Sequence, residues 1–147
     1  MATIEVFDTM VQCPLTRGKP SMKKGNLPEH DITGIIGYTG LAEGCVVISI
    51  SLPLALHATS MMLGKEVNGI DHDVIDAVGE LANMIAGQAK KHLEALKLRV
   101  TLPTVVSGRS HHIGYPEGVT AMCIPFDGEL GSMSVEFALV EVGTVVV

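Results

Sequence analysis

The stretch GELANMIAG, residues 79–87, decides how this sequence is read, because its apolar residues predict a helix that begins and ends on glycine. A glycine inside a helix costs about 1 kcal/mol relative to alanine. Between the glycines lie Glu80 and Asn83, three residues apart, so a helix places both on one face. A helix that could be buried and uniform instead carries a polar pair beside residues that weaken it.

The flanking sequence predicts a long helix, over residues 72–97, with one apolar and one polar face. Asp71 precedes it as a cap, and lysines lie near its end, as the helix dipole favours. At about 100° per residue, the apolar side chains gather in one arc. The residues in this predicted buried arc are Val74, Val78, Leu81, Ala82, Ile85, Ala89, Leu93 and Leu96.

The opposite face of this helix carries Asp76, Glu80, Asn83, Gly87 and Glu94, with Met84 on its flank. A solvated face gains nothing from a glycine, so Gly87 suggests the close approach of another backbone or a partner. Gly79, towards the other edge, suggests packing within the domain. From spacing alone, ordinary solvated residues remain the alternative interpretation of Glu80 and Asn83.

The rest of the chain, taken as one domain over residues 1–147, alternates between strand and helix patterns without βαβ repeats. The fold class that this order predicts is α+β, with a mainly antiparallel sheet covered by helices. The further elements predicted are an amphipathic helix over 3–12, an irregular or edge segment over 15–23, a hairpin of strands 31–40 and 44–51, a helix over 53–63 capped by Ser51, an edge or bulged strand over 98–108 containing Pro103, and a hairpin of 119–126 and 131–142 turning at Asp127-Gly128.

Composition excludes several classes of function. The net charge of −6 argues against a nucleic-acid binder or an anionic-membrane binder, since both need clustered Lys and Arg. Residues 45–63 lack charged side chains, but Pro53 and His57 interrupt them, so they are interpreted as a strand followed by a helix rather than a membrane span. Three widely spaced cysteines, with Cys13 expected to be the most exposed, indicate reduced thiols in a cytoplasmic protein. The first residues show no secretory signal.

The segment DAVGELANMIAGQAK, residues 76–90, closely resembles the signature helix of the CheX-type chemotaxis phosphatases, relatives of CheC and FliY. In that family the signature is an acid followed three residues later by Asn, here Glu80 and Asn83. The segments DITGIIGYTG, GCVVISIS, SMMLGKEV, PTVVSG and MCIPF occur in the same order in CheX-like proteins, so the resemblance covers most of the chain from about residue 14. One departure is that these proteins usually carry a longer helical run before the first strand.

The resemblance implies a CheC-like fold and a phosphatase that hydrolyses the aspartyl phosphate of a CheY-like response regulator. It implies that Asn83 orients the attacking water and that Glu80 pairs with a lysine of the regulator. Asp76, Met84 and Gly87 would then be partner contacts. It also implies that Mg²⁺ is supplied by the regulator, that this chain needs no cofactor of its own, and that the protein is a cytoplasmic homodimer.

Other interpretations remain. A CheX-like module that binds a response regulator without turnover would carry the same polar stripe, and a flagellar or structural relative is a third possibility. The adjacent His111 and His112 point opposite ways in an extended segment, so a shared metal ion is not expected. Ser107 and Ser110 lie near these histidines, but the sequence has no GxSxG motif and no ordered acid partner for a serine hydrolase.

Overall fold

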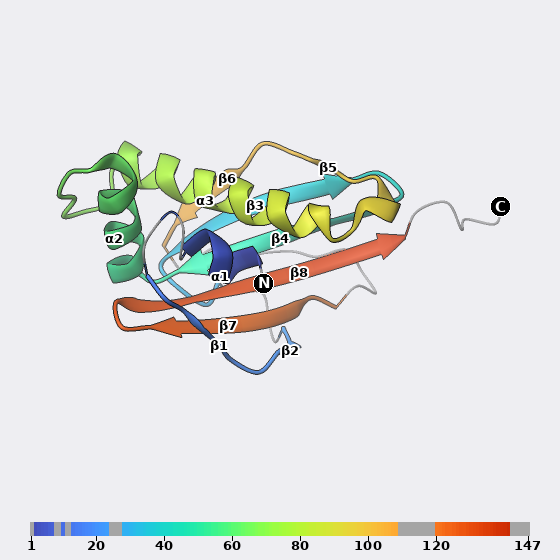
Figure 1. Ribbon diagram of the computed structural model, residues 1–147, viewed down its shortest axis with the longest axis horizontal. Helices are drawn as coiled ribbons and strands as arrows, with labels where there is room; N and C mark the ends of the chain where they lie inside the picture. Colours follow the sequence, from blue (N-terminus) through green and yellow to red (C-terminus); the bar gives the residue numbers. More distant parts are fainter. Residues whose placement is uncertain (1, 8–9, 11–12, 24–27, 109–119, 142–147) are drawn as a thin grey trace.

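A single antiparallel sheet forms the body of the molecule (Figure 1). The computed structural model describes residues 2–7, 10, 13–23, 28–108 and 120–141. Within them the strand order is β1-β7-β8-β4-β3-β5, and β2 also pairs with β7 and β6 with β3. The strands are β1 (Thr16–Arg17), β2 (Ser21–Met22), β3 (Ile32–Thr39), β4 (Ala42–Ile50), β5 (Arg99–Val100), β6 (Thr104–Ser107), β7 (Met122–Gly128) and β8 (Gly131–Glu141).

The helices gather on one face of this sheet, which confirms the predicted α+β class (Figure 1). They are α1 (Ala2–Val6), α2 (Leu52–Leu63) and α3 (His72–Lys91), with a short 3-10 helix, η2 (Glu94–Leu96). The longest, α3, runs along β3, while α2 packs at one end of it and α1 beside it. None of the described helices is both long enough and apolar enough to cross a membrane.

The main core lies between α3 and the sheet, as the helical periodicity predicts. Five residues of the predicted arc are fully or almost fully buried, and the three nearest its end are only half-buried. The buried five are Val74, Val78, Leu81, Ala82 and Ile85, and they belong to one cluster with Ile32, Ile36, Val46, Ile48, Ile50, Phe126 and Met133 of the strands. The amphipathic pattern therefore gives the correct orientation of α3.

The predicted end of this helix was wrong. The Asp71 side chain accepts a hydrogen bond from Val74 N at 3.1 Å and so caps the start as expected, but α3 ends at Lys91 rather than at residue 97. The chain then forms η2 and reverses at Lys97, whose φ is 49°. This reversal is needed because the following strand, β5, must return antiparallel to β3.

Two expected helix features also differ. In the helix predicted over 3–12, only the part up to Val6 is α-helical (α1), whereas Phe7 and Met10 are π-helical, and Met10 is exposed. Ser51 does not cap α2: its Oγ accepts from Ser132 N at 3.1 Å, while Asp31 Oδ2 accepts from Leu52 N at 2.8 Å. The Ser51 hydroxyl is bound to the start of β8. The carboxylate of Asp31, just before β3, therefore accepts the hydrogen bond at the start of α2.

Several strand boundaries differ from the predicted ones at the ends that meet loops. The segment predicted as one strand over 98–108 divides into β5 and β6, in keeping with the expected edge position of Pro103. The second hairpin turns at Glu129-Leu130, not at Asp127-Gly128, because Gly128 still pairs with Gly131. In the first hairpin, β4 already begins at Ala42, so the link is shorter than the three residues expected.

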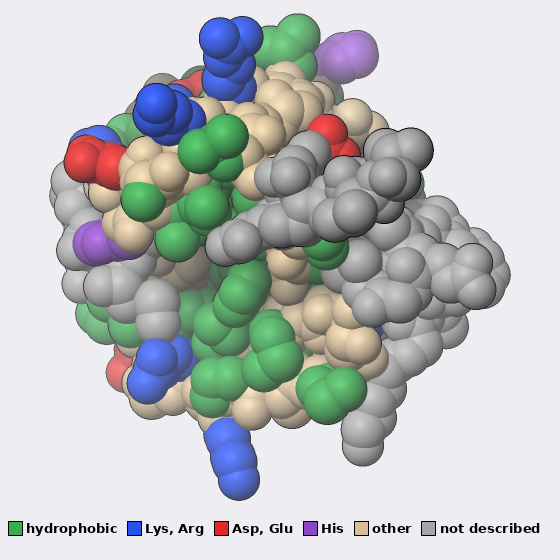
Figure 2. Space-filling model, turned by 90° about the vertical axis from the view of Figure 1, so that its right-hand side faces the viewer, with side chains coloured by type: hydrophobic (Ala, Val, Ile, Leu, Met, Phe, Trp, Pro, Cys, Tyr) green, Lys and Arg blue, Asp and Glu red, His purple; other side chains and the backbone are tan. Residues whose placement is uncertain are grey.

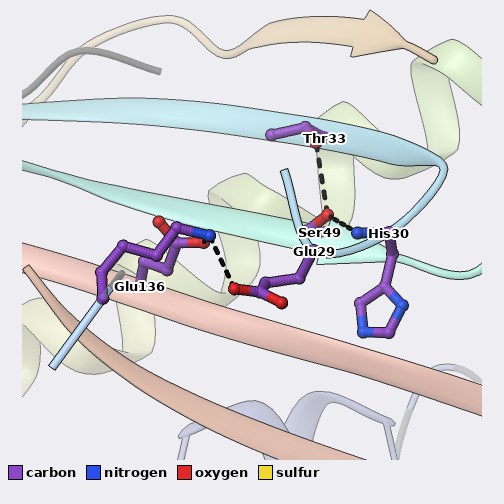
Figure 3. Close-up of polar contacts among 6 residues, drawn as sticks. Glu29, His30, Thr33, Ser49 and Glu136 are labelled. Atoms are coloured by element: carbon purple, nitrogen blue, oxygen red, sulfur yellow. Dashed lines mark hydrogen bonds and ion pairs between the residues drawn. The ribbon is translucent and has the colours of Figure 1, made fainter. Parts of the chain in front are cut away.

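The sheet face away from the helices carries a polar network (Figure 3). The ammonium of Lys23 lies 3.0 Å from a carboxylate oxygen of Glu136 and 2.7 Å from one of Glu29. Glu136, in the middle of β8, is fully buried. Beside this pair, Ser49 Oγ lies 3.4 Å from Thr33 Oγ1 and accepts from His30 N at 2.8 Å. The network fastens the segment that precedes β3 onto the sheet.

The charges of this network also bear on a possible metal site and on two cysteine thiols. Glu29, Cys123 and Glu136 are close enough together for a metal ion, but the Lys23 ammonium already lies between the carboxylates as their cation. Burial and the charge of Glu136 both raise the pKa of the Cys45 and Cys123 thiols, which favours the protonated form. Cys13, expected to be the most exposed cysteine, is instead buried.

An apolar hollow lies between the C-terminal half of α3 and strands β4, β7 and β8. It has a volume of about 250 Å³, and its walls include Val46, Ile85, Ile124, Val135 and Phe137. Figure 2 views the end of the molecule where α3 and β8 finish, and hydrophobic side chains gather across the middle of that end. Its lining also includes Tyr38 and His92 but none of Asp76, Glu80, Asn83 and Gly87, so it is separate from the polar face of α3.

The Lys23–Glu136 pair generates a stability prediction. Lys23→Met should lower the free energy of unfolding by about 3–5 kcal/mol, because it leaves the Glu136 carboxylate buried without its cation. Glu29→Gln is the matched control, with an expected cost of about 0–1 kcal/mol, since Glu29 is exposed. Urea denaturation of the three proteins measures both values.

The pH dependence of this contribution has a defined sign. Burial lowers the pKa of Lys23, but hydrogen bonds to Glu29 and Glu136 outweigh it and raise the pKa above the ordinary 10.5. The stabilisation is therefore complete below about pH 10.5 and declines as the pH rises through the folded-state pKa. Equal stability of wild type and Lys23→Met at pH 8 would contradict a role for the pair.

Candidate functional site

An open groove runs between α3 and the sheet edge formed by β5 and β6. Its volume is about 360 Å³. The residues that line it are Ile75, Asp76, Gly79, Glu80, Asn83, Pro103 and Val105. Three of the five site residues predicted from the sequence, Asp76, Glu80 and Asn83, therefore share one groove.

Glu80 and Asn83 lie on the solvent-facing side of α3, where they line this groove. Glu80 is exposed and Asn83 is half-buried, so neither is turned into the core. Within the described part of the chain, neither side chain makes a hydrogen bond or an ion pair. A carboxylate and an amide one helical turn apart are thus available to a molecule that enters the groove.

Packing under α3 fixes the position of the pair. Ala82 approaches β3 so closely that a Cβ on Gly34 would lie 3.2 Å from the Ala82 Cβ. One turn further along, Tyr38 Oη donates to Ala86 O at 2.8 Å. Burial raises the pKa of Tyr38 to about 12, so the phenol stays protonated and keeps donating at neutral pH. These contacts hold the helix segment between Glu80 and Gly87 at a fixed height above the sheet.

The two glycines differ, as the sequence suggests. Gly79 is buried against the groove wall, and a Cβ there would lie 3.4 Å from Val105 Cγ2 and 3.5 Å from Pro103 Cγ. Gly79 is therefore packed within the domain, but an added Cβ would make ordinary van der Waals contacts there. A Cβ on Gly87 would meet nothing within 4 Å. Internal packing therefore gives no reason for the glycine at position 87.

Two of the predicted partner contacts lie outside the groove lining. Gly87 is on α3 beyond Asn83, and Met84 is half-buried and packs against the core, so only part of its side chain is available. The groove also contains Ile75, Pro103 and Val105, which were not predicted from the sequence as site residues. The proline in the 98–108 segment signals an edge, but no local pattern indicates that this edge meets the polar face of α3.

Among the remaining candidates from the sequence, the one that the structure describes does not join this site. Ser107 is exposed at the end of β6. Ser110, His111 and His112 lie outside the described residues. The groove residues therefore provide an amide and carboxylates, a set that can orient water and bind a cationic group but supplies no strong nucleophile.

Comparison with known proteins assigns the family. A sequence model described as Chemotaxis phosphatase CheX matches residues 32–127, which is more than half of the chain and includes all of α3. The chain belongs to the CheX family. The resemblance noticed in residues 76–90 is thereby confirmed, together with the CheC-like α+β fold.

Individual CheX relatives agree in sequence and structure. The CheY-P phosphatase CheX of Thermotoga maritima is 42% identical over 95 residues, and this alignment spans 63% of the present chain and 61% of that relative. The crystal structure of CheX from Vibrio vulnificus superposes with a TM-score of 0.86 at 32% identity, covering 95% of this chain and 94% of the other. A complex of CheX with CheY, BeF3 and Mg²⁺ from Borrelia burgdorferi gives a TM-score of 0.79 at 25% identity, with 95% and 94% coverage.

The anchoring of α3 in this CheX protein can be measured. Tyr38→Phe removes the hydrogen bond to Ala86 O and should lower the free energy of unfolding by about 0.5–1.5 kcal/mol, measured by urea denaturation. Amide hydrogen exchange should also become faster around residues 86–90. Unchanged exchange in that turn would show that the bond does not restrain the helix.

Proposed function

We propose that this CheX protein hydrolyses the aspartyl phosphate of a CheY-like response regulator in chemotaxis or two-component signalling. The observation that carries the proposal is the open groove beside α3, with Glu80 and Asn83 facing it and unengaged by other described residues. The family assignment and the name of the Thermotoga maritima relative support the same reaction. The partner is then a phosphorylated receiver domain that seats its phosphoryl group over the groove.

Asn83 orients the water in this reaction. Its amide both donates and accepts hydrogen bonds, so it can hold a water in line with the phosphorus without acting as a base. The water oxygen forms a new bond to phosphorus while the bond to the aspartyl oxygen breaks. The products are inorganic phosphate, which keeps the proton lost by water, and the free carboxylate of the regulator. Positioning supplies most of the rate increase, since an acyl phosphate already has a good leaving group.

Glu80 docks the regulator rather than removing a proton. An exposed carboxylate at this position can pair with a lysine beside the phosphorylated aspartate, and closure of the interface strengthens such a pair by excluding water. Asp76 adds negative charge one turn before Glu80. Gly87 permits close approach of the receiver backbone, and the exposed part of Met84 adds adaptable apolar contact.

The wider assignments follow from this reaction. The Mg²⁺ that accompanies phosphoryl transfer is held by the regulator, and this chain contributes no cofactor. The protein acts in the cytoplasm, where response regulators are found, and forms a homodimer, as the family resemblance implies. Neither nucleic acid nor a membrane surface is a partner, in keeping with the net charge of −6.

The water-orienting role gives a kinetic prediction. Asn83→Ala should slow the loss of phosphate from a phosphorylated CheY-like regulator by about 100-fold, because the positioned water is lost. The affinity of the Asn83→Ala variant for the regulator should stay within a few-fold of the wild-type affinity. Asn68→Ala, at an exposed asparagine before α3, is the matched control and should behave as wild type. Decay of radiolabelled phospho-regulator measures the rates.

The docking role separates the phosphatase from a binding module without turnover. Glu80→Lys should weaken regulator binding in both cases, whereas Glu94→Lys, at an exposed position after α3, should not. If the wild-type protein binds a cognate regulator but never speeds its dephosphorylation, the adaptor interpretation is correct and the role of Asn83 in orienting water is wrong.

Gly87 provides a test in which stability and binding change in opposite directions. Gly87→Ala should raise the free energy of unfolding by about 0.5–1 kcal/mol, because the added Cβ meets open space and alanine favours the helix. The same methyl group should weaken regulator binding about tenfold by overpacking the interface. Thermal unfolding and titration calorimetry measure the two effects. A stabilised variant with unchanged affinity would remove Gly87 from the contact surface.

A further inference from the structure

We infer that Leu102, which projects from a bulge between β5 and β6, is an apolar docking contact for the receiver domain that occupies the neighbouring groove. This inference rests on the proposed function and adds a residue that determines binding outside helix α3. Leu102 is 88% exposed, the highest exposure among the large hydrophobic residues in the described ranges. The following residue, Pro103, lines the groove with Glu80 and Asn83.

The strand register shows that the bulge displaces Leu102 from the sheet edge. Val100 pairs with Tyr38 and Thr104 pairs with Ile35. Two residues of β3, 36 and 37, therefore face three residues, 101–103, on the other side. The extra residue bends the chain away from the ladder, a device that re-aims side chains beside functional sites.

Thr101 holds this bulge in one conformation. Its backbone N donates to Gly37 O at 2.9 Å, and its hydroxyl accepts from Gly37 N at 2.8 Å. The same hydroxyl lies 3.3 Å from Leu102 O, to which it donates. A glycine at position 37 favours this arrangement, since a Cβ there would lie in tight contact, 3.1 Å from Thr101 Cγ2. A leucine on a fixed loop is presented at a lower entropy cost than one on a mobile loop.

The local geometry favours a receiver domain over a second copy of this chain as the occupant. A sheet-to-sheet dimer at this edge would need a continuous row of backbone donors and acceptors. The bulge interrupts that row, and Pro103 has no N–H to contribute. A partner that enters the groove instead meets the carboxylate of Glu80 on one side and Pro103 on the other, and Leu102 is the exposed residue next to Pro103 in the chain. The matching surface is a basic group at the phosphorylation site with an apolar side chain next to it.

A single exposed leucine is common on protein surfaces, so the inference needs a sharp test. Leu102→Ala in the full chain should raise both the Kd for a CheY-like regulator activated with BeF3 and Mg²⁺ and the KM for the phosphorylated regulator about tenfold. The kcat should stay within about twofold, because the water-orienting group is untouched. The unfolding midpoint should not change, since the side chain is almost fully exposed.

Two further variants complete the experiment. Met22→Ala is the matched control, because Met22 is 61% exposed at the opposite edge of the sheet and should leave Kd and KM unchanged. Thr101→Val keeps Leu102 but removes the hydroxyl that fixes it, and should raise Kd by a smaller factor, about threefold. Light scattering after size exclusion follows the oligomeric state of every variant.

The outcomes distinguish this inference from the proposed function. If Leu102→Ala binds and turns over as wild type while Asn83→Ala loses turnover, the inference is wrong and the phosphatase assignment stands. If Leu102→Ala instead changes the oligomeric state, the residue contacts a second copy of the chain and the inference is overturned. If the wild-type protein neither binds nor dephosphorylates cognate regulators, the proposed function fails and this inference fails with it.

Discussion

The structure depends on the close seating of α3 against β3. A glycine at position 34 lets Ala82 approach the strand, and the Tyr38 phenol fastens the next turn of the helix through Ala86 O. Once this face is fixed, the opposite face must point outward, because the two are about half a helical turn apart. The exposure of Glu80 and Asn83 is thus a consequence of how the other side of the same helix packs.

The sheet beneath the helix is stabilised from both sides. On the helix side the core is aliphatic, with few aromatic residues and many Val, Ile and Leu side chains. On the other side, the buried carboxylate of Glu136 is balanced by Lys23, which also reaches Glu29. A charged pair at the centre of a sheet face gives little net stability compared with apolar packing, but it specifies which chain segment can lie there. The segment that leads into β3 is placed by this charge requirement.

The candidate site combines a rigid helix with a shaped sheet edge. The helix supplies the polar side chains, and the β5–β6 edge supplies a wall through Pro103 and Val105. Such an arrangement suits chemistry that depends on positioning, because neither side of the groove has to reorganise when a partner arrives. It also explains how a site can serve a partner that brings its own reacting group: the groove needs shape and two polar side chains, and no nucleophile.

The amino-acid sequence by itself determined the class of fold, the direction in which α3 faces, its Asp71 cap and the family to which the chain belongs. These properties are local or periodic, so they can be read from neighbouring residues and from the order of motifs. The sequence did not determine where α3 ends, because the chain reverses at Lys97 so that β5 can pair with β3. It also did not reveal that Asp31 replaces Ser51 at the start of α2, or that Pro103 and Val105 face Glu80 and Asn83. Only the tertiary structure decided these points, since each depends on contacts between segments that are distant in the chain and are brought together by the sheet.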